Sequence, residues 1–229
     1  MDRRFAIYGA PPRGSALARW GAAWLGRDAE SGAALTPPTP PGWPAAEVAR
    51  LTEFPRRYGL HATLKPPFRL AAGSDEAALA DAVEQLAASH PAPRPTRLRL
   101  AALGGFLALV PEGDAVELHG LADACVERLD RFRAPPDSAE LARRRPDRLS
   151  PREQEHLARW GYPYVFDTFR FHITVTGALA PAERDAVYKA LIPLLTPVLL
   201  EPLRIDDIAL FVQDDGGPFR LDRRFPLRG

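Results

Sequence analysis

Two short segments of the chain carry the residue types best suited to chemistry. Residues 60–64 read Leu-His-Ala-Thr-Leu and residues 171–175 read Phe-His-Ile-Thr-Val. The ordinary pKa of histidine, about 6.5, lets an imidazole take or give a proton near neutral pH. In phosphodiester cleavage one unprotonated imidazole removes a proton from water or a ribose hydroxyl, and a second, protonated imidazole supplies one to the leaving oxygen. We predict that His61 and His172 form such a catalytic pair, in a scheme that needs no metal or other cofactor.

The alternation of apolar and polar residues predicts where these side chains point. A period of two is typical of a half-buried strand, so the apolar residues of each segment face a core and the histidine and threonine face away from it. By the same parity Lys65 joins His61 and Thr63, and Arg170 joins the second motif. We expect the hydroxyls of Thr63 and Thr174 to bind phosphate oxygens, and Lys65 or Arg170 to stabilise developing negative charge.

A single His-x-Thr would carry little weight, because it arises often by chance. Two copies in the same apolar frame favour a catalytic pair over a zinc site, since neither copy brings a nearby carboxylate or cysteine ligand. Three functions fit the pair. The first is an enzyme that cleaves a small phosphodiester. The second is an RNA-end or nucleotide binding module, and the third is an RNA end-joining enzyme.

The elements around the two motifs repeat in the same order. A first strand is predicted over 5–8 and a helix around Leu17, Trp20 and Trp24, whose tryptophans we assign to the core. Each His strand is then followed by a helix and a hairpin. The predicted segments are a helix from Ser74 to about Ala88, strands 96–103 and 106–110, a helix from Pro181, and strands 203–212 and 219–225. An internal duplication within one bilobal domain spanning 1–229 is the simplest interpretation.

Other segments connect these units. Residues 36–44 are rich in proline and predict a surface loop, and residues 134–148 predict an irregular or mobile insertion; either is a candidate lid. Helices are predicted around 45–51, 118–132 and 150–160, the last opened by a capping box at Ser150. His156 within that helix is interpreted as a surface histidine, and His90 and His119 have no partner in sequence.

Composition narrows the class of protein. The 30 Lys and Arg residues nearly balance the 29 Asp and Glu residues, so the formal net charge is only +1. Long nucleic acid and a membrane surface are therefore unfavoured partners, because both need a basic field. The single cysteine, Cys125, forms no internal disulfide. No signal-like or membrane-spanning stretch is visible, which predicts a cytoplasmic protein. The oligomeric state stays open.

The two motifs resemble those of the 2H phosphoesterase superfamily, which is named for paired His-x-Thr/Ser motifs. Four stretches resemble the branch of that superfamily found beside phosphonate-utilisation genes. They are Phe-Ala-Ile-Tyr at 5–8 with the following prolines, Trp-Leu-Gly-Arg-Asp at 24–28, residues 57–65 and residues 166–172.

The resemblance implies an α+β fold with two pseudo-symmetric lobes, each a small antiparallel sheet with helices outside, around a central cleft. It implies hydrolysis of a cyclic phosphate, such as a ribose cyclic phosphate, with His61 and His172 as catalytic residues and Thr63 and Thr174 as phosphate ligands. Strand parity adds candidates for the cleft wall, namely Tyr8, Tyr58, Arg57, Lys65, Arg170, Phe211 and Gln213. The sequence leaves open the substrate and which histidine is the base.

Overall fold

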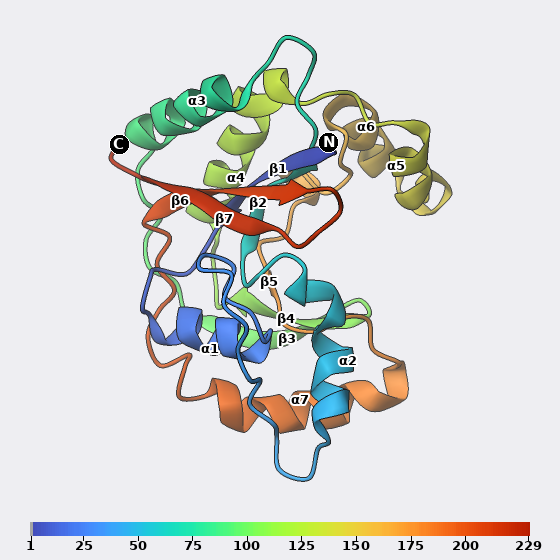
Figure 1. Cartoon of the computed structure of the whole chain (residues 1–229). Helices are drawn as coiled ribbons and strands as arrows, with labels where there is room; N and C mark the ends of the chain where they lie inside the picture. The colour runs from blue at the N-terminus through green and yellow to red at the C-terminus, as the bar shows by residue number, and fades with distance from the viewer. Residues whose placement is uncertain (1) are drawn as a thin grey trace.

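One antiparallel sheet of seven strands forms the centre of the molecule in a computed structural model that describes residues 2–229 (Figure 1). Its spatial order is β3-β4-β5-β2-β1-β6-β7. The strands are β1 (Arg3–Gly9), β2 (Ala62–Phe68), β3 (Leu98–Leu103), β4 (Phe106–Pro111), β5 (Ile173–Thr174), β6 (Asp207–Asp214) and β7 (Arg220–Pro226). The α+β class predicted from the sequence is confirmed.

The repeated order of elements is present in the structure. Strand β2 is followed by a helix and the β3–β4 hairpin, and β5 is followed by a helix and the β6–β7 hairpin. The two halves share a single sheet, because β2 pairs with β5 at Ala62 and Ile173. The hairpin of the first half joins the His strand of the second half, because β4 pairs with β5. The hairpin of the second half joins the sheet through β6, which pairs with β1, the neighbour of β2.

Helices cover the sheet at both ends (Figure 1). They are α1 (Ala16–Trp24), α2 (Ala45–Arg56), α3 (Glu76–Ser89), α4 (Val116–Leu129), α5 (Ser138–Arg143), α6 (Pro151–Trp160) and α7 (Pro181–Leu195), with short 3-10 turns η1 (Asp130–Phe132), η2 (Pro146–Arg148) and η3 (Phe166–Thr168). Helix α3 packs on β6 and β7, α4 packs on β2, and α7 packs on β3 and β4. No helix within residues 2–229 has the length and apolar character needed to cross a bilayer.

Local signals explain most helix boundaries. The Ser150 side chain accepts a hydrogen bond from the Glu153 amide and Pro151 occupies the first turn, so α6 starts as predicted. Helix α3 is capped by Asp75, whose carboxylate accepts from the Ala78 amide, rather than by Ser74. Residues 36–44 contain no helix or strand, in line with their prolines.

The segment 134–148 differs from its prediction as an irregular or mobile insertion. It holds helix α5 and turn η2. A capping box explains the helix, because Asp137 accepts from the Glu140 amide while Glu140 accepts from the amide of Asp137. Glu140 also binds Arg69, at 3.0 Å, which fixes α5 to the end of β2. The ordering therefore comes partly from an ion pair between segments distant in sequence.

The sheet is buried on both faces near its centre. One face of β1 places Phe5 and Ile7 in the main apolar core, which also contains residues of α3 and α4. The other face places Tyr8 in a smaller cluster with Phe211 and Phe219. That smaller cluster is the floor on which the first histidine rests, so the core and the candidate site share a strand.

Candidate active site

Strands β2 and β5 bring the two motifs side by side. Ala62 and Ile173, the middle residues of the two His-x-Thr motifs, are antiparallel partners. Continuing that register by one residue each way sets Thr63 opposite His172 and His61 opposite Thr174. Side chains at alternate positions share a face, so all four polar groups lie on one face of the sheet. The pairing explains why the two motifs form one site.

His61 is held in a defined tautomer. Its Nδ1 lies 2.8 Å from the carbonyl oxygen of Gly59, so Nδ1–H donates and Nε2 is left to accept, here from the Thr63 hydroxyl at 3.2 Å. Burial lowers the pKa of His61 to about 4, against the effect of the Gly59 hydrogen bond, and the nearby charge of His172 lowers it further. Unliganded His61 is therefore a neutral imidazole at neutral pH.

His172 repeats this arrangement on the other strand. Its Nδ1 lies 2.8 Å from the carbonyl oxygen of Arg170, two residues earlier, as Gly59 is two residues before His61. The ring packs on Phe106, with ring centroids 5.8 Å apart. Burial also lowers the pKa of His172, and the bond to Arg170 opposes that shift. Both motifs thus use Nδ1 as an anchor and keep Nε2 for chemistry.

The four motif side chains line a pocket of about 700 Å³, which we call the main pocket. Tyr8 and Tyr58 also line it. Tyr8 is almost fully buried and its ring stacks on that of His61. Ligand pockets typically enclose a few hundred to about 1,000 Å³, so a nucleotide or a phosphorylated sugar fits this space.

A second cavity of about 530 Å³ adjoins the first, and we call it the side pocket. Thr63 and His172 line both cavities. The side pocket is bordered by three carboxylates and one arginine, namely Asp123, Glu153, Asp167 and Arg170. The structure thus places Arg170 beside His172 but outside the main pocket.

Lys65 is not brought to either pocket. Tyr8 pairs with Thr63 whereas Ile7 pairs with Lys65, so Leu64 is an extra residue in β2. Such a bulge reverses the alternation of faces. Lys65 therefore shares the core face with Ile7, is 1 % exposed, and donates to the Val126 carbonyl and to Asp130, each at 3.2 Å. The predicted phosphate contact from Lys65 is not what the structure shows.

The remaining cleft-wall candidates lie around the site rather than in it. The Arg57 guanidinium donates to the Gly216 carbonyl and is exposed. Phe211 packs beneath Tyr8, with ring centroids 4.8 Å apart. Gln213 is buried and accepts a hydrogen bond from Arg4 at 2.7 Å. Of these three, Phe211 belongs to the aromatic cluster beneath the pocket.

Sequence reasoning missed the arginines of the main pocket. Five line it: Arg4, Arg69, Arg133, Arg143 and Arg144. Arg4 precedes the buried part of β1, and the others come from the end of β2, the turn after α4 and helix α5 with its C-cap. The alternation of faces along β2 and β5 does not predict these arginines, because they come together only in the tertiary fold.

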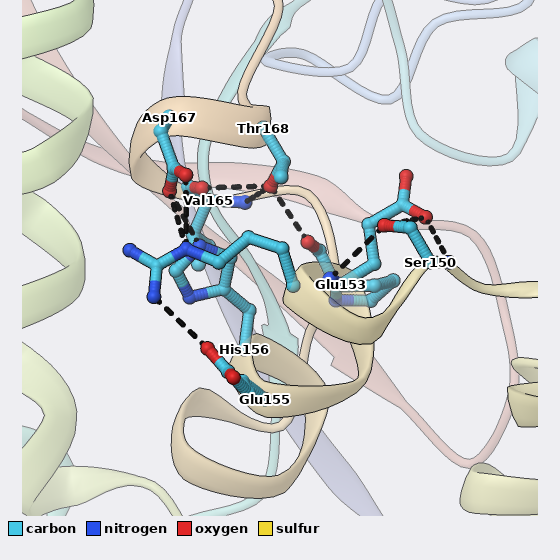
Figure 2. Close-up of polar contacts among 9 residues, drawn as sticks. Ser150, Glu153, Glu155, His156, Val165, Asp167 and Thr168 are labelled. Atoms are coloured by element: carbon cyan, nitrogen blue, oxygen red, sulfur yellow. Dashed lines mark hydrogen bonds and ion pairs between the residues drawn. The ribbon is translucent and has the colours of Figure 1, made fainter.

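His156 was also misjudged as a surface residue. It is 4 % exposed and its Nε2 lies 2.7 Å from Asp167, which in turn accepts from Arg152 at 2.9 Å (Figure 2). Arg152 first and His156 second lower the pKa of Asp167 to about 2. This pair joins α6 to η3, the turn that precedes the second motif (Figure 2).

Among residues 2–229, no group of three or more His, Cys, Asp and Glu side chains is arranged to hold a metal ion. Two neutral imidazoles facing one pocket, with two hydroxyls between them and arginines around them, are suited to acid–base chemistry on a phosphate ester.

Comparison with known proteins places the chain in a family. A family model described as "Protein of unknown function (DUF1045)" matches residues 63–220, which is more than half of the chain and includes the second motif. The chain belongs to this family.

Two curated relatives carry the name ribose 1,5-bisphosphate phosphokinase PhnN. The protein from Janthinobacterium sp. (strain Marseille) is 38 % identical over 231 residues, covering 99 % of this chain and 51 % of the relative. The protein from Laribacter hongkongensis (strain HLHK9) is 38 % identical over 221 residues, covering 96 % and 51 %. The chain therefore spans about half the length of these relatives.

A crystal structure of a conserved protein of unknown function from Agrobacterium tumefaciens str. C58 matches 98 % of this chain and 87 % of its own, at 12 % identity and a TM-score of 0.43.

Proposed function

We propose that the chain opens a cyclic phosphate on a small phosphorylated ribose, with its two histidines as base and acid, in the manner of a 2H phosphoesterase. The observation that carries this proposal is the matched anchoring of His61 and His172. Each Nδ1 binds a backbone carbonyl at 2.8 Å, and both rings line the main pocket. A purely structural role for one histidine would not explain a second histidine anchored in the same way on the adjacent strand.

The two environments differ enough to suggest the roles. His61 is stacked on Tyr8 and has the pKa of about 4, so it is the imidazole that stays neutral and takes a proton from the attacking water. The water oxygen forms a bond to phosphorus while one ring P–O bond breaks. The leaving sugar oxygen receives its proton from His172.

The acid must be protonated for this step, although burial lowers the pKa of His172 in the free protein. An anionic phosphate beside the ring favours the charged imidazolium, because an opposite charge stabilises it. Substrate binding would thus raise the pKa of His172, with the Thr63 and Thr174 hydroxyls holding the phosphate oxygens.

The names of the relatives support a ribose phosphate as substrate but do not bring kinase chemistry to this chain. The phosphate-binding loop of many kinases needs a lysine directly after a glycine, and this sequence has no Gly-Lys pair. The chain also matches only half of each relative. A ribose cyclic phosphate combines the named sugar with the chemistry of the site.

The test is turnover of ribose 1,2-cyclic phosphate and of nucleoside 2′,3′-cyclic phosphates, followed by phosphorus NMR. We expect His61→Ala and His172→Ala each to lower kcat by about 10²- to 10⁴-fold, the usual contribution of a general acid or base. His90→Ala is the matched control, because His90 lies outside both pockets. An unchanged rate in either motif variant contradicts the proposal. Binding without turnover, or ligation of RNA ends, would favour the other two functions.

A further inference from the structure

The main pocket has a second end, away from the two motifs, where arginine side chains line it. We propose that the arginines there bind a second phosphoryl group, so that the substrate is a sugar carrying one phosphate at the histidines and another at its far side. The inference rests on the proposed function, whose site supplies the first phosphate position.

The strand register separates the two ends. In the β1–β2 pair, Tyr8 lies opposite Thr63 at the motif end, whereas Phe5 lies opposite Phe68 further along. Arg4 and Arg69 adjoin that second pair, at the start of β1 and just past the end of β2. Both arginines line the main pocket. The pocket therefore extends from the histidines along β2 to a basic end.

Two of the five arginines are already neutralised. Arg69 pairs with Glu140 at 3.0 Å and with Asp137 at 3.1 Å. Arg133 pairs with Asp130, with its Nε 2.8 Å from the carboxylate. These ion pairs fix α5 and the turn after α4 against the sheet, so their guanidinium groups serve as anchors for the pocket wall.

The other three arginines have no carboxylate partner within the described residues. Arg4 donates to Gln213, Arg144 lies over the Tyr162 ring at 4.6 Å from its centroid, and Arg143 is exposed. Glu140, the one acidic residue lining the main pocket among residues 2–229, is used by Arg69. Three positive charges without a carboxylate partner thus line the main pocket in a protein of net charge +1.

A phosphate monoester matches this end chemically. It carries about two negative charges at neutral pH and offers three oxygens to guanidinium donors. A carboxylate would leave most of the positive charge unbalanced. A long nucleic acid would need the basic surface to continue beyond the pocket, which the near-neutral composition does not favour. A doubly phosphorylated ribose, with its sugar between the two ends, is the substrate class we infer.

The kinetic test compares ribose 1,2-cyclic phosphate with the same compound bearing a 5-phosphate. We expect wild type to prefer the 5-phosphorylated compound by about a hundredfold in kcat/KM, since several charge-assisted bonds are added. Arg143→Ala and Arg144→Ala should each lower kcat/KM for that compound by about tenfold and leave the unphosphorylated one unchanged. Arg148→Ala is the matched control, because Arg148 is an exposed arginine of the same segment outside the pocket.

The outcomes separate this inference from the proposed function. Equal turnover of both compounds, or a variant that affects both alike, overturns the second phosphate site and leaves the proposed function standing. Better turnover of oligonucleotide 2′,3′-cyclic phosphates than of the doubly phosphorylated sugar also overturns it. If no compound is cleaved, calorimetry with ribose 1,5-bisphosphate and ribose 1-phosphate decides. Tighter binding of the bisphosphate that weakens about tenfold in Arg143→Ala supports the site, and equal affinities overturn it.

Discussion

The aromatic ring of Tyr8 stacks on the imidazole of His61, with ring centroids 3.7 Å apart and an interplanar angle of 23°. Tyr8 is 1 % exposed and itself packs on Phe211 and Phe219. The first histidine therefore has a rigid aromatic support, in addition to the hydrogen bond from Nδ1 to Gly59. A ring fixed on one face and at one nitrogen presents its other nitrogen in a constant direction.

This support predicts different effects of two substitutions at Tyr8. Tyr8→Phe keeps the ring, so we expect kcat within about threefold of wild type. Tyr8→Leu removes the stacked face, worth about 1 kcal/mol, and lets the imidazole reorient, so kcat should fall by at least about tenfold. Steady-state kinetics on the best cyclic phosphate distinguishes the two. A large rise in KM for Tyr8→Phe would instead show that the hydroxyl binds substrate.

Stability should depend on pH through His61. The unfolded histidine has its ordinary pKa near 6.5, whereas burial holds the folded pKa at about 4. Between these values the unfolded chain binds more protons, so the free energy of unfolding falls as pH decreases from about 6.5 and the loss is complete near pH 4. Between pH 7 and pH 5 the expected loss from this group is about 2 kcal/mol.

Urea denaturation at pH 7 and pH 5 checks this expectation. His61→Gln cannot titrate, so its stability should fall less over this interval than that of wild type. His90→Gln is the control substitution, because His90 lies outside both pockets. If wild type and His61→Gln lose the same free energy of unfolding between pH 7 and pH 5, burial does not hold His61 neutral.

Gly59 supplies the carbonyl that orients His61, and its backbone requires glycine. Its φ is +75°, and an added Cβ would lie 2.5 Å from the Cβ of Ala29. Gly59→Ala should therefore cost about 3 kcal/mol, from the left-handed backbone and the overlap together, and should lower kcat as well. Gly73→Ala is the matched control, with φ of +81° and open space, and should cost only about 1 kcal/mol. Equal losses for the two variants in chemical denaturation would contradict the steric argument.

The sequence predicted the parts of the site that depend on local alternation. His61, Thr63, His172 and Thr174 follow from the period of two within each motif, and all four line one pocket. What alternation cannot supply is the antiparallel pairing of Ala62 with Ile173, because it joins residues from opposite halves of the chain. Repetition of the motif suggested that pairing only indirectly.

The incorrect predictions have physical causes of the same kind. His156 is buried because η3 docks on α6, which is a tertiary event with no signature in the helix itself. Helix α5 has a local capping box, but its place over the main pocket depends on Arg69. Contacts between distant segments determine both of these positions. The incorrect prediction for Lys65 has a different cause, the bulge at Leu64, which reverses the alternation of faces beyond the first motif.

Lys65 gives the clearest test of that reversal. Lys65→Met removes an ammonium group that lies on the core face, and Asp130 keeps its pair with Arg133 at 2.8 Å. Because a buried ion pair replaced by an apolar chain of similar size is often close to neutral, we expect the free energy of unfolding to change by about 1 kcal/mol or less. The kcat/KM for cyclic phosphates should stay within about twofold of wild type, since Lys65 touches neither pocket.

Thr63→Val is the comparison, because the Thr63 hydroxyl contacts His61 and faces the main pocket; it should lower kcat/KM by about tenfold. A tenfold loss in Lys65→Met with unchanged stability would mean that the ammonium reaches the phosphate after all, and that the bulge does not direct Lys65 into the core.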